Sequence, residues 1–216
     1  MKKYLPLILI FGLMLWGIFG TDIFNKDSEP INEVEALKTG DATLDSLNQL
    51  VLENPDNPGL YFLRAKKYHE LEGYDQAISD LRQAISRDSN NTSYFHLLAD
   101  VYLDNYNSRM AINTMHNAVQ RFPERIPTLL KLSEFQLILK QYEESMKTAD
   151  EVLKIDPQEA EGYMMLGMNF RELGDTARAI NSFQSATEIN ADLIDAWILL
   201  GNLFAEKGNP IAERYF

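Results

Sequence analysis

The chain has 216 residues, of which 45% are hydrophobic, so it is long enough to bury a substantial apolar core. Its 20 basic and 32 acidic residues give a net charge of −12, which repels phosphate backbones and argues against nucleic acid as a partner. The absence of cysteine excludes disulfides, thiolate metal sites, a cysteine nucleophile and a lipidated N-terminal cysteine.

Residues 1–24 are predicted to form a transmembrane anchor. Lys2 and Lys3 precede an uncharged run from Tyr4 to Thr21, close to the ~20 residues that cross a bilayer as a helix. A signal peptide is the alternative, but no alanine precedes Ala36 and the glycines offer no small-x-small cleavage site, so we favour an uncleaved segment. Positive charge marks the cytoplasmic side. We therefore expect a single-pass membrane protein, with its N-terminus in the cytoplasm and the rest on the trans (periplasmic) side.

The next segments lead from the membrane into a folded region. Residues 25–42 are polar and acidic and contain Pro30, which is typical of a tether. After them, spacings of three and four predict a lone amphipathic helix over residues 43–54, which would cover the first full repeat. Its apolar stripe consists of Leu44, Leu47, Leu50 and Val51.

From residue 59 onward the chain repeats one pattern every 34 residues, which indicates an array of similar units. Each unit predicts two amphipathic helices; in residues 160–191, Gly174 and Asp175 separate them. Each helix has an apolar stripe on one side, which only a neighbouring unit can bury. A large residue opens the first helix of each unit: Tyr61, Phe95, Leu129, Tyr163 and Trp197. A small residue follows four positions later: Ala65, Ala99, Ser133, Gly167 and Gly201. The second helices carry further small residues: Ala77, Ala111, Ser145, Ala179, Ala84, Ala118 and Ala186.

The array is predicted to span residues 43–216 and to contain four full repeats, from about residue 59 to residue 191. The fifth repeat, residues 192–216, is cut short. Asn209 and Pro210 resemble the cap and first position of a second helix, but the sequence stops at Phe216. The chain is therefore either a fragment or completed at this end by a partner or by self-association. The residues expected to lack cover there are Trp197, Leu200 and Phe204.

This pattern resembles the tetratricopeptide repeat (TPR) family, from about Thr43 to the end of the chain. The 34-residue period, the aromatic, leucine and glycine series of the first helix and the alanine, aromatic and alanine series of the second carry the resemblance. Arg64 replaces the usual leucine of one repeat, and Tyr106 and Lys140 replace the usual loop glycine. The resemblance implies an all-α fold, a right-handed superhelical array of antiparallel helix pairs, here behind a transmembrane helix. The chain as a whole resembles membrane-associated TPR proteins of the bacterial cell envelope.

The sequence offers no catalytic group, metal site or cofactor site. His69, His96 and His116 lie on three different predicted helices, without an accompanying acid and nucleophile. His96 and Asp100 are one helical turn apart, but two ligands are too few for a tight metal site, so we interpret them as a surface pair. No glycine-rich phosphate loop follows a strand. We predict that the chain is not an enzyme.

The resemblance implies that the first helices of the repeats line a concave groove. An apolar line with polar flanks suits an extended or helical peptide, and methionine would give an adaptable surface. The alternative is that some of these residues pack as core. The groove residues implied by the resemblance are Phe62, Lys66, His96, Asp100, Leu130, Glu134, Met164, Met168, Ile198 and Asn202. Asp100 and Glu134 stand where the family's carboxylate-clamp members need basic or amide residues, which argues against recognition of an acidic C-terminal peptide.

Two functions remain open. The first is a membrane-anchored scaffold that binds a protein or peptide partner in its groove without catalysis. The alternative is the docking or sensor portion of a larger enzyme, such as a kinase or transferase, whose catalytic domain would lie beyond residue 216. The sequence after residue 216 would distinguish them.

Overall fold

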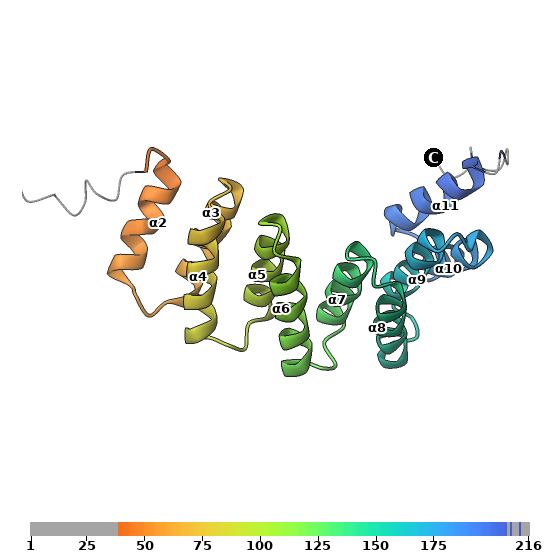
Figure 1. The fold of residues 1–216 in the computed structure, drawn as a ribbon, viewed down its shortest axis with the longest axis horizontal. Helices are drawn as coiled ribbons and strands as arrows, with labels where there is room; N and C mark the ends of the chain where they lie inside the picture. Colours follow the sequence, from red (N-terminus) through yellow and green to blue (C-terminus); the bar gives the residue numbers. More distant parts are fainter. Residues whose placement is uncertain (1–38, 207, 209–211, 213–216) are drawn as a thin grey trace, which may run out of the picture. The chain divides into compact units, whose positions relative to one another are not determined.

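The computed structural model describes residues 39–206, 208 and 212, and the chain divides into two compact units, Met1–Asp45 and Ser46–Phe216. The described residues form ten α-helices and no strand, which confirms the predicted all-α class (Figure 1). The predicted anchor, residues 1–24, lies outside the described residues, and so does most of the predicted tether. None of the helices that the structure does describe combines the length and the hydropathy that a bilayer crossing requires.

The helices have similar lengths and are joined by short turns. Of the first unit, only residues 39–45 are described, and the Asp41 carboxylate accepts a hydrogen bond from the Leu44 amide at 2.9 Å. This bond caps the start of the first helix. The helix bounds are α2 (Ala42–Glu53), α3 (Pro58–Glu70), α4 (Tyr74–Arg87), α5 (Thr92–Asp104), α6 (Ser108–Arg121), α7 (Ile126–Ile138), α8 (Tyr142–Ile155), α9 (Ala160–Glu172), α10 (Thr176–Ile189) and α11 (Ile194–Glu206).

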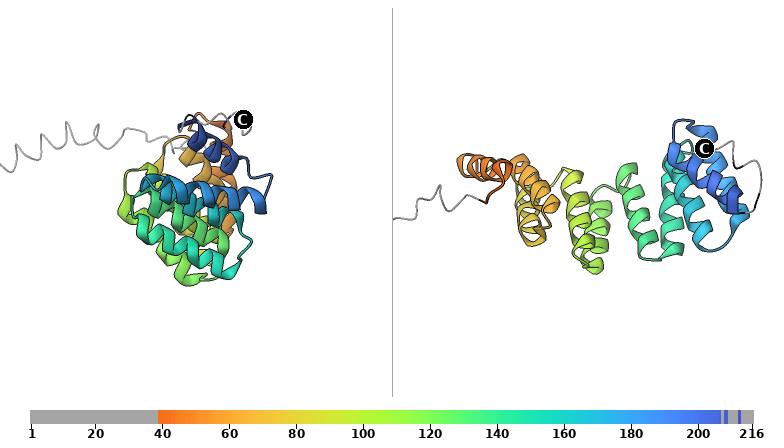
Figure 2. Two further views of the ribbon diagram at one scale, coloured as in Figure 1. Left: turned by 90° about the vertical axis from the view of Figure 1, so that its right-hand side faces the viewer. Right: turned by 90° about the horizontal axis from the view of Figure 1, so that it is seen from above.

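Within the second unit, the helices pack as consecutive pairs. The helices α3 and α4, α5 and α6, α7 and α8, and α9 and α10 lie against each other, and α11 lies against α10. Each pair also contacts the next, mainly through its second helix, and the views of Figure 2 show the same order. The core is therefore distributed between neighbours instead of lying at one centre.

Small residues let the helices of this unit approach closely. Ala65, Ala99, Ala111 and Ala179 are fully buried, as expected from the repeat pattern. Larger side chains fill the space that they leave: Leu81, Met115, Phe135 and Phe183 are almost completely buried. Side chains of both kinds are needed because protein interiors are packed to crystal-like density.

Gly167 marks the tightest of these contacts. A Cβ atom at this position would lie 2.6 Å, 2.7 Å and 3.0 Å from three ring atoms of Phe183, which is buried in α10. In the first full repeat the equivalent pair is Ala65 and Leu81, both fully buried. The side-chain volumes of the two helices thus compensate each other: the pair with glycine in its first helix has phenylalanine in its second, and the pair with alanine has the smaller leucine.

The turn within each pair contains a residue in the left-handed backbone region. This residue is Glu72, Tyr106, Lys140 and Gly174 in successive repeats, with φ between 54° and 77°. In the first full repeat, Glu72 and not the adjacent Gly73 holds this conformation. Three repeats therefore keep the backbone geometry without the glycine that best tolerates it.

A polar cluster lies in the interior between α7, α8 and α9. The Ser133 and Ser145 hydroxyls are 3.0 Å apart, and the Ser145 hydroxyl also donates to the Ser133 carbonyl at 2.8 Å. The Asn169 amide nitrogen donates to the Ser145 hydroxyl and to the Met165 carbonyl, both at 2.8 Å. All three polar side chains are fully buried, and the Asn169 side-chain oxygen has no protein partner. We call Ser133, Ser145 and Asn169 the polar seam.

A second polar contact lies nearer the start of the array. Arg64 on α3 forms two hydrogen bonds of 2.7 Å with the carboxylate of Asp80 on α4 and one of 3.2 Å with Asn48. Asp80 is 5% exposed. Hydrogen bonding to the Asp80 carboxylate raises the pKa of Arg64, although burial of the guanidinium acts in the opposite direction. Arg64 therefore compensates a buried carboxylate where the repeat pattern has leucine.

At the other end of the described residues, α11 covers α10. Leu200 is 1% exposed and packs in a cluster with Phe183 and Leu203, with Phe204 beside them. The expectation that Leu200 lacks cover is therefore wrong, because the face of α11 that carries it lies against α10. The second helix predicted after Asn209 and Pro210 falls mostly outside the described residues.

Candidate functional site

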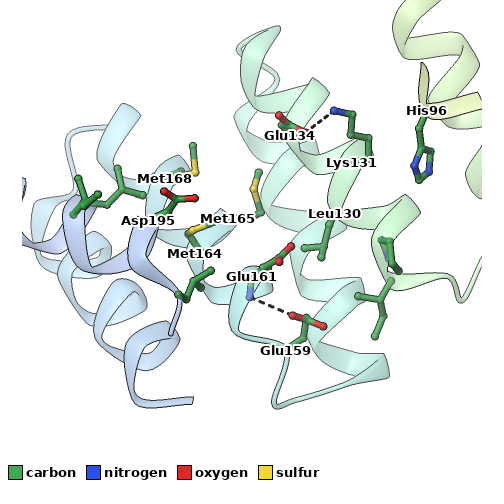
Figure 3. Close-up of a pocket in the computed structure, with 15 residues that line it drawn as sticks. His96, Leu130, Lys131, Glu134, Glu159, Glu161, Met164, Met165, Met168 and Asp195 are labelled. Carbon is green, nitrogen blue, oxygen red and sulfur yellow. Dashed lines mark hydrogen bonds and ion pairs between the residues drawn. The ribbon is translucent and has the colours of Figure 1, made fainter. Parts of the chain in front are cut away.

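The main pocket of the described residues lies across α7 and α9, the first helices of two successive pairs, and α11, the helix that follows them. It has a volume of about 750 Å³ and is lined by α7, α9 and α11, with His96 of α5 at one end. This volume falls in the range of ligand-binding pockets, roughly 300 to 1,000 Å³. Figure 3 shows the side chains that converge on it. Its lining residues are His96, Ile126, Pro127, Leu130, Lys131, Glu134, Glu159, Glu161, Met164, Met165, Met168, Leu193, Asp195, Ile198 and Leu199.

The floor of the pocket is apolar. Leu130 comes from α7, and Met164 and Met168 lie one helical turn apart on α9, so both face the same side. These three side chains are half-buried, and Ile198 on α11 is 42% exposed. Met165 is 5% exposed and joins the pocket to the core. The floor therefore presents partly exposed apolar side chains, several of them methionines that adapt to irregular shapes.

One end of the pocket carries a compact charge cluster. The Lys131 ammonium lies 3.0 Å from a carboxylate oxygen of Asp100 and 3.2 Å from one of Glu134 (Figure 3 shows the second contact). Burial lowers the pKa of Lys131, but the hydrogen bonds and charges of the two acids outweigh it, so that the pKa is raised overall. Burial likewise raises the pKa of Asp100. The Lys131 ammonium thus forms ion pairs with two carboxylates at this end of the pocket.

His96 closes the same end. Its Nε2 lies 3.1 Å from the hydroxyl of Thr128 on α7. Partial burial, with the positive charges of Lys131 and Arg125, lowers the pKa of His96. The imidazole is therefore neutral at pH 7 and acts as a hydrogen-bonding group.

The other edge of the pocket is acidic. Glu159 precedes α9, Glu161 lies in its first turn, and Asp195 lies in the first turn of α11. The Glu159 carboxylate accepts a hydrogen bond from the Glu161 amide at 3.4 Å (Figure 3). Burial, and then the charge of Glu159, raises the pKa of Glu161. We call Glu159, Glu161 and Asp195 the acidic edge.

The pocket unites part of the groove set expected from sequence. His96, Leu130, Glu134, Met164, Met168 and Ile198 line it. The four others do not. Phe62 packs against Tyr94, with ring centroids 5.1 Å apart, and Asp100 pairs with Lys131 without lining the pocket itself. Lys66 on α3 and Asn202 on α11 are exposed away from the pocket. The binding role of these residues stays a prediction.

The acidic edge was not expected from sequence. Glu161 and Asp195 are 34 residues apart and so hold one position in successive repeats, two residues before the opening aromatic. This recurrence of an acidic residue at one repeat position is the feature of the sequence from which the acidic edge could have been predicted. Glu159 lies in the turn before the helix, where the repeat pattern specifies no residue.

Comparison with known proteins agrees with the repeat pattern. Residues 58–91, 126–159 and 160–193 each match the tetratricopeptide repeat family model. The pair α5 and α6 lies between the first two matches and has the same two-helix form.

Solved structures of tetratricopeptide proteins share the fold. The crystal structure of the MamA protein matches with a TM-score of 0.56 at 19% identity, over 74% of this chain and 87% of that one. PilF of Pseudomonas aeruginosa matches with a TM-score of 0.61 at 19% identity, over 73% and 72% of the two chains. YrrB, described as a TPR protein with an unusual peptide-binding site, matches with a TM-score of 0.53 at 18% identity, over 77% and 86%. At these identities the likeness establishes the fold alone.

Proposed function

Because the chain is built of tetratricopeptide repeats, which make protein-interaction scaffolds, we propose that it binds a peptide segment of a partner protein in the pocket between α7, α9 and α11. The observation that carries this proposal is the partly exposed apolar floor of Leu130, Met164, Met168 and Ile198. Apolar side chains that gather without cover mark interaction sites more often than scattered ones do. YrrB supports the proposal as a repeat protein of this fold with a peptide-binding site.

The scaffold acts without catalysis in this proposal. The groups that line the pocket are apolar side chains, one lysine held by two acids, one neutral histidine and carboxylates. They can hold and orient a ligand. In the right-handed superhelix typical of this family, the first helices of the repeats form the concave side, which suits the position of the pocket on α7, α9 and α11.

A double substitution in the floor tests the pocket. The full chain in mild detergent is immobilised, and a displayed library of random peptides is selected on it and on the L130D/M164D variant. We expect the variant to lose the selected peptides, because a charge in an apolar pocket must be desolvated when the peptide binds. Both residues are half-buried, so helical circular dichroism and the melting temperature should change little.

A matched control separates the pocket from general surface apolarity. Leu63 and Leu173 are each 50% exposed and lie outside the pocket. The L63D/L173D variant should therefore retain the selected peptides. Equal binding by the parent chain and the L130D/M164D variant would refute the proposed function.

We also propose that the run from Tyr4 to Thr21 anchors the chain in a membrane, with the repeats on the trans (periplasmic) side. Its support is sequence alone: an uncharged run behind two lysines, without a small-x-small cleavage site. Extraction with alkaline carbonate should leave the full-length chain in the membrane pellet. A soluble product that begins near residue 21 would overturn the anchor.

A further inference from the structure

The acidic edge carries charge that no described residue neutralises through an ion pair. Among the described residues, Glu159, Glu161 and Asp195 form no ion pair within 4.0 Å. Lys131 is the one lysine or arginine that lines the pocket, and it is already held by Asp100 and Glu134. The pocket therefore has an excess of negative charge beside an apolar floor.

The position of these acids at helix starts gives a simpler explanation, since carboxylates there interact favourably with the helix dipole. That interaction would stabilise the charged form of Glu161 and lower its pKa. Burial and the neighbouring Glu159 raise its pKa instead. The charge of Glu159 thus disfavours the charged form of Glu161 in the free protein, and a cation placed beside Glu161 would counteract this effect.

The acidity of the whole chain is a second simple explanation, because its net charge is −12. A second hollow of the described residues, about 370 Å³ between α4, α5 and α6, tests it. Its polar lining consists of Arg82, Ser86, Asn113, Thr114 and Asn117, without a carboxylate. The two hollows therefore differ in charge, and carboxylates line only the pocket on α7, α9 and α11 of these two.

Resting on the proposed function, we infer that the occupant of this pocket is a basic, apolar peptide segment. Its apolar side chains lie on Leu130, Met164 and Met168, and its lysine or arginine side chains face Glu159, Glu161 and Asp195. The charge complementarity sets the orientation of the segment: the basic residues lie at the starts of α9 and α11, and the apolar residues lie toward Lys131. An acidic segment would meet the same three carboxylates and be repelled.

The selected library peptides provide the first test. Peptides that need the floor, and so are lost on the L130D/M164D variant, should be enriched in lysine and arginine over the unselected library. Floor-dependent peptides without a basic excess would overturn this inference and leave the proposed function standing. Absence of any floor-dependent peptide would overturn both.

A charge-matched pair of variants gives the second test, by fluorescence anisotropy with the best basic peptide. E159Q/E161Q/D195N removes the acidic edge, and glutamine at position 159 keeps a side-chain oxygen for the helix cap. E143Q/E144Q/D150N removes the same number and kind of charges from exposed positions on α8, outside the pocket.

We expect the edge variant to weaken binding on the order of tenfold, since each exposed ion pair changes affinity by a factor of roughly 1.5 to 5. The α8 variant should bind within about twofold of the parent chain, because its three substituted side chains are exposed to solvent and do not line the pocket. Added salt should weaken binding to the parent chain more steeply than binding to the edge variant. Equal affinities of the edge and α8 variants, or a peptide with lysine replaced by glutamine that binds as tightly as the basic one, would refute the inference.

Discussion

The close approach of Gly167 to Phe183 predicts the effect of a single methyl group. In Gly167→Ala the new Cβ would lie 2.6 Å from one ring carbon of Phe183, whereas ordinary contacts begin at 3.4 Å. The ring would have to move by about 0.8 Å, and Phe183 is fully buried. Overpacking of this kind costs roughly 1 to 3 kcal/mol. Alanine gains about 1 kcal/mol over glycine in a helix interior, so the net loss of stability should lie between about 0 and 2 kcal/mol.

Urea unfolding followed by circular dichroism measures this loss, and a second substitution isolates its cause. Phe183→Leu shortens the side chain, and the pair Ala65 and Leu81 shows that alanine and leucine fit together at the equivalent positions. In the F183L background, Gly167→Ala should therefore become stabilising, by up to about 1 kcal/mol. If Gly167→Ala stabilises the parent chain, or destabilises both backgrounds equally, the ring contact does not control this position.

Three further predictions concern other features of the array. Lys140→Gly should stabilise the fold by roughly 0.5 to 1 kcal/mol in urea unfolding, because φ is 58° there, and Gly174→Ala should destabilise it by a similar amount. Arg64→Leu should cost about 3 kcal/mol by leaving Asp80 buried without its cation, and Asp80→Thr in the same chain should recover most of it, as the next repeat has leucine and threonine at these positions. The pKa of His96 is lowered in the folded protein. As the pH drops below about 6.5, His96 therefore binds a proton in the unfolded chain before it does so in the folded chain, and the stability of the fold should decrease. Differences between the parent chain and H96Q from pH 7.5 to pH 5 measure this contribution, and identical profiles would contradict it.

The repeat period made most of the fold predictable. Because one 34-residue pattern recurs, the small positions such as Ala65 and Ala99 could be aligned, and both are fully buried. The left-handed turn position was less accessible. Gly73 is the glycine of its turn, but Glu72 holds the positive φ, because the position in the repeat and not the residue type determines the conformation.

The pocket was only partly predictable, for a physical reason. Helical spacing places Phe62, Leu130 and Met164 at equivalent positions, but the neighbouring side chains decide which of them stays open. Phe62 meets the ring of Tyr94, whereas Leu130 and Met164 line the pocket. Such differences depend on tertiary contacts that one chain's periodicity does not encode. In the sequence, the acidic edge was indicated only by the recurrence of an acidic residue at the position of Glu161 and Asp195.

The polar seam has a consequence for how the array assembles. Near-identical helix pairs can dock onto the wrong neighbour during folding, a known failure of repeat proteins. Apolar faces resist this error poorly, because leucine packs against almost any apolar surface. No other repeat offers the Asn169 amide to Ser145: at the position of Asn169, the other repeats have Lys67, Val101, Phe135 and Leu203. A helix misplaced against α8 in the position of α9 would bury the Ser145 hydroxyl without the Asn169 amide as a partner. The polar seam thus favours docking of the fourth full pair, α9 and α10, against the third, α7 and α8, over docking against another pair of this repetitive chain.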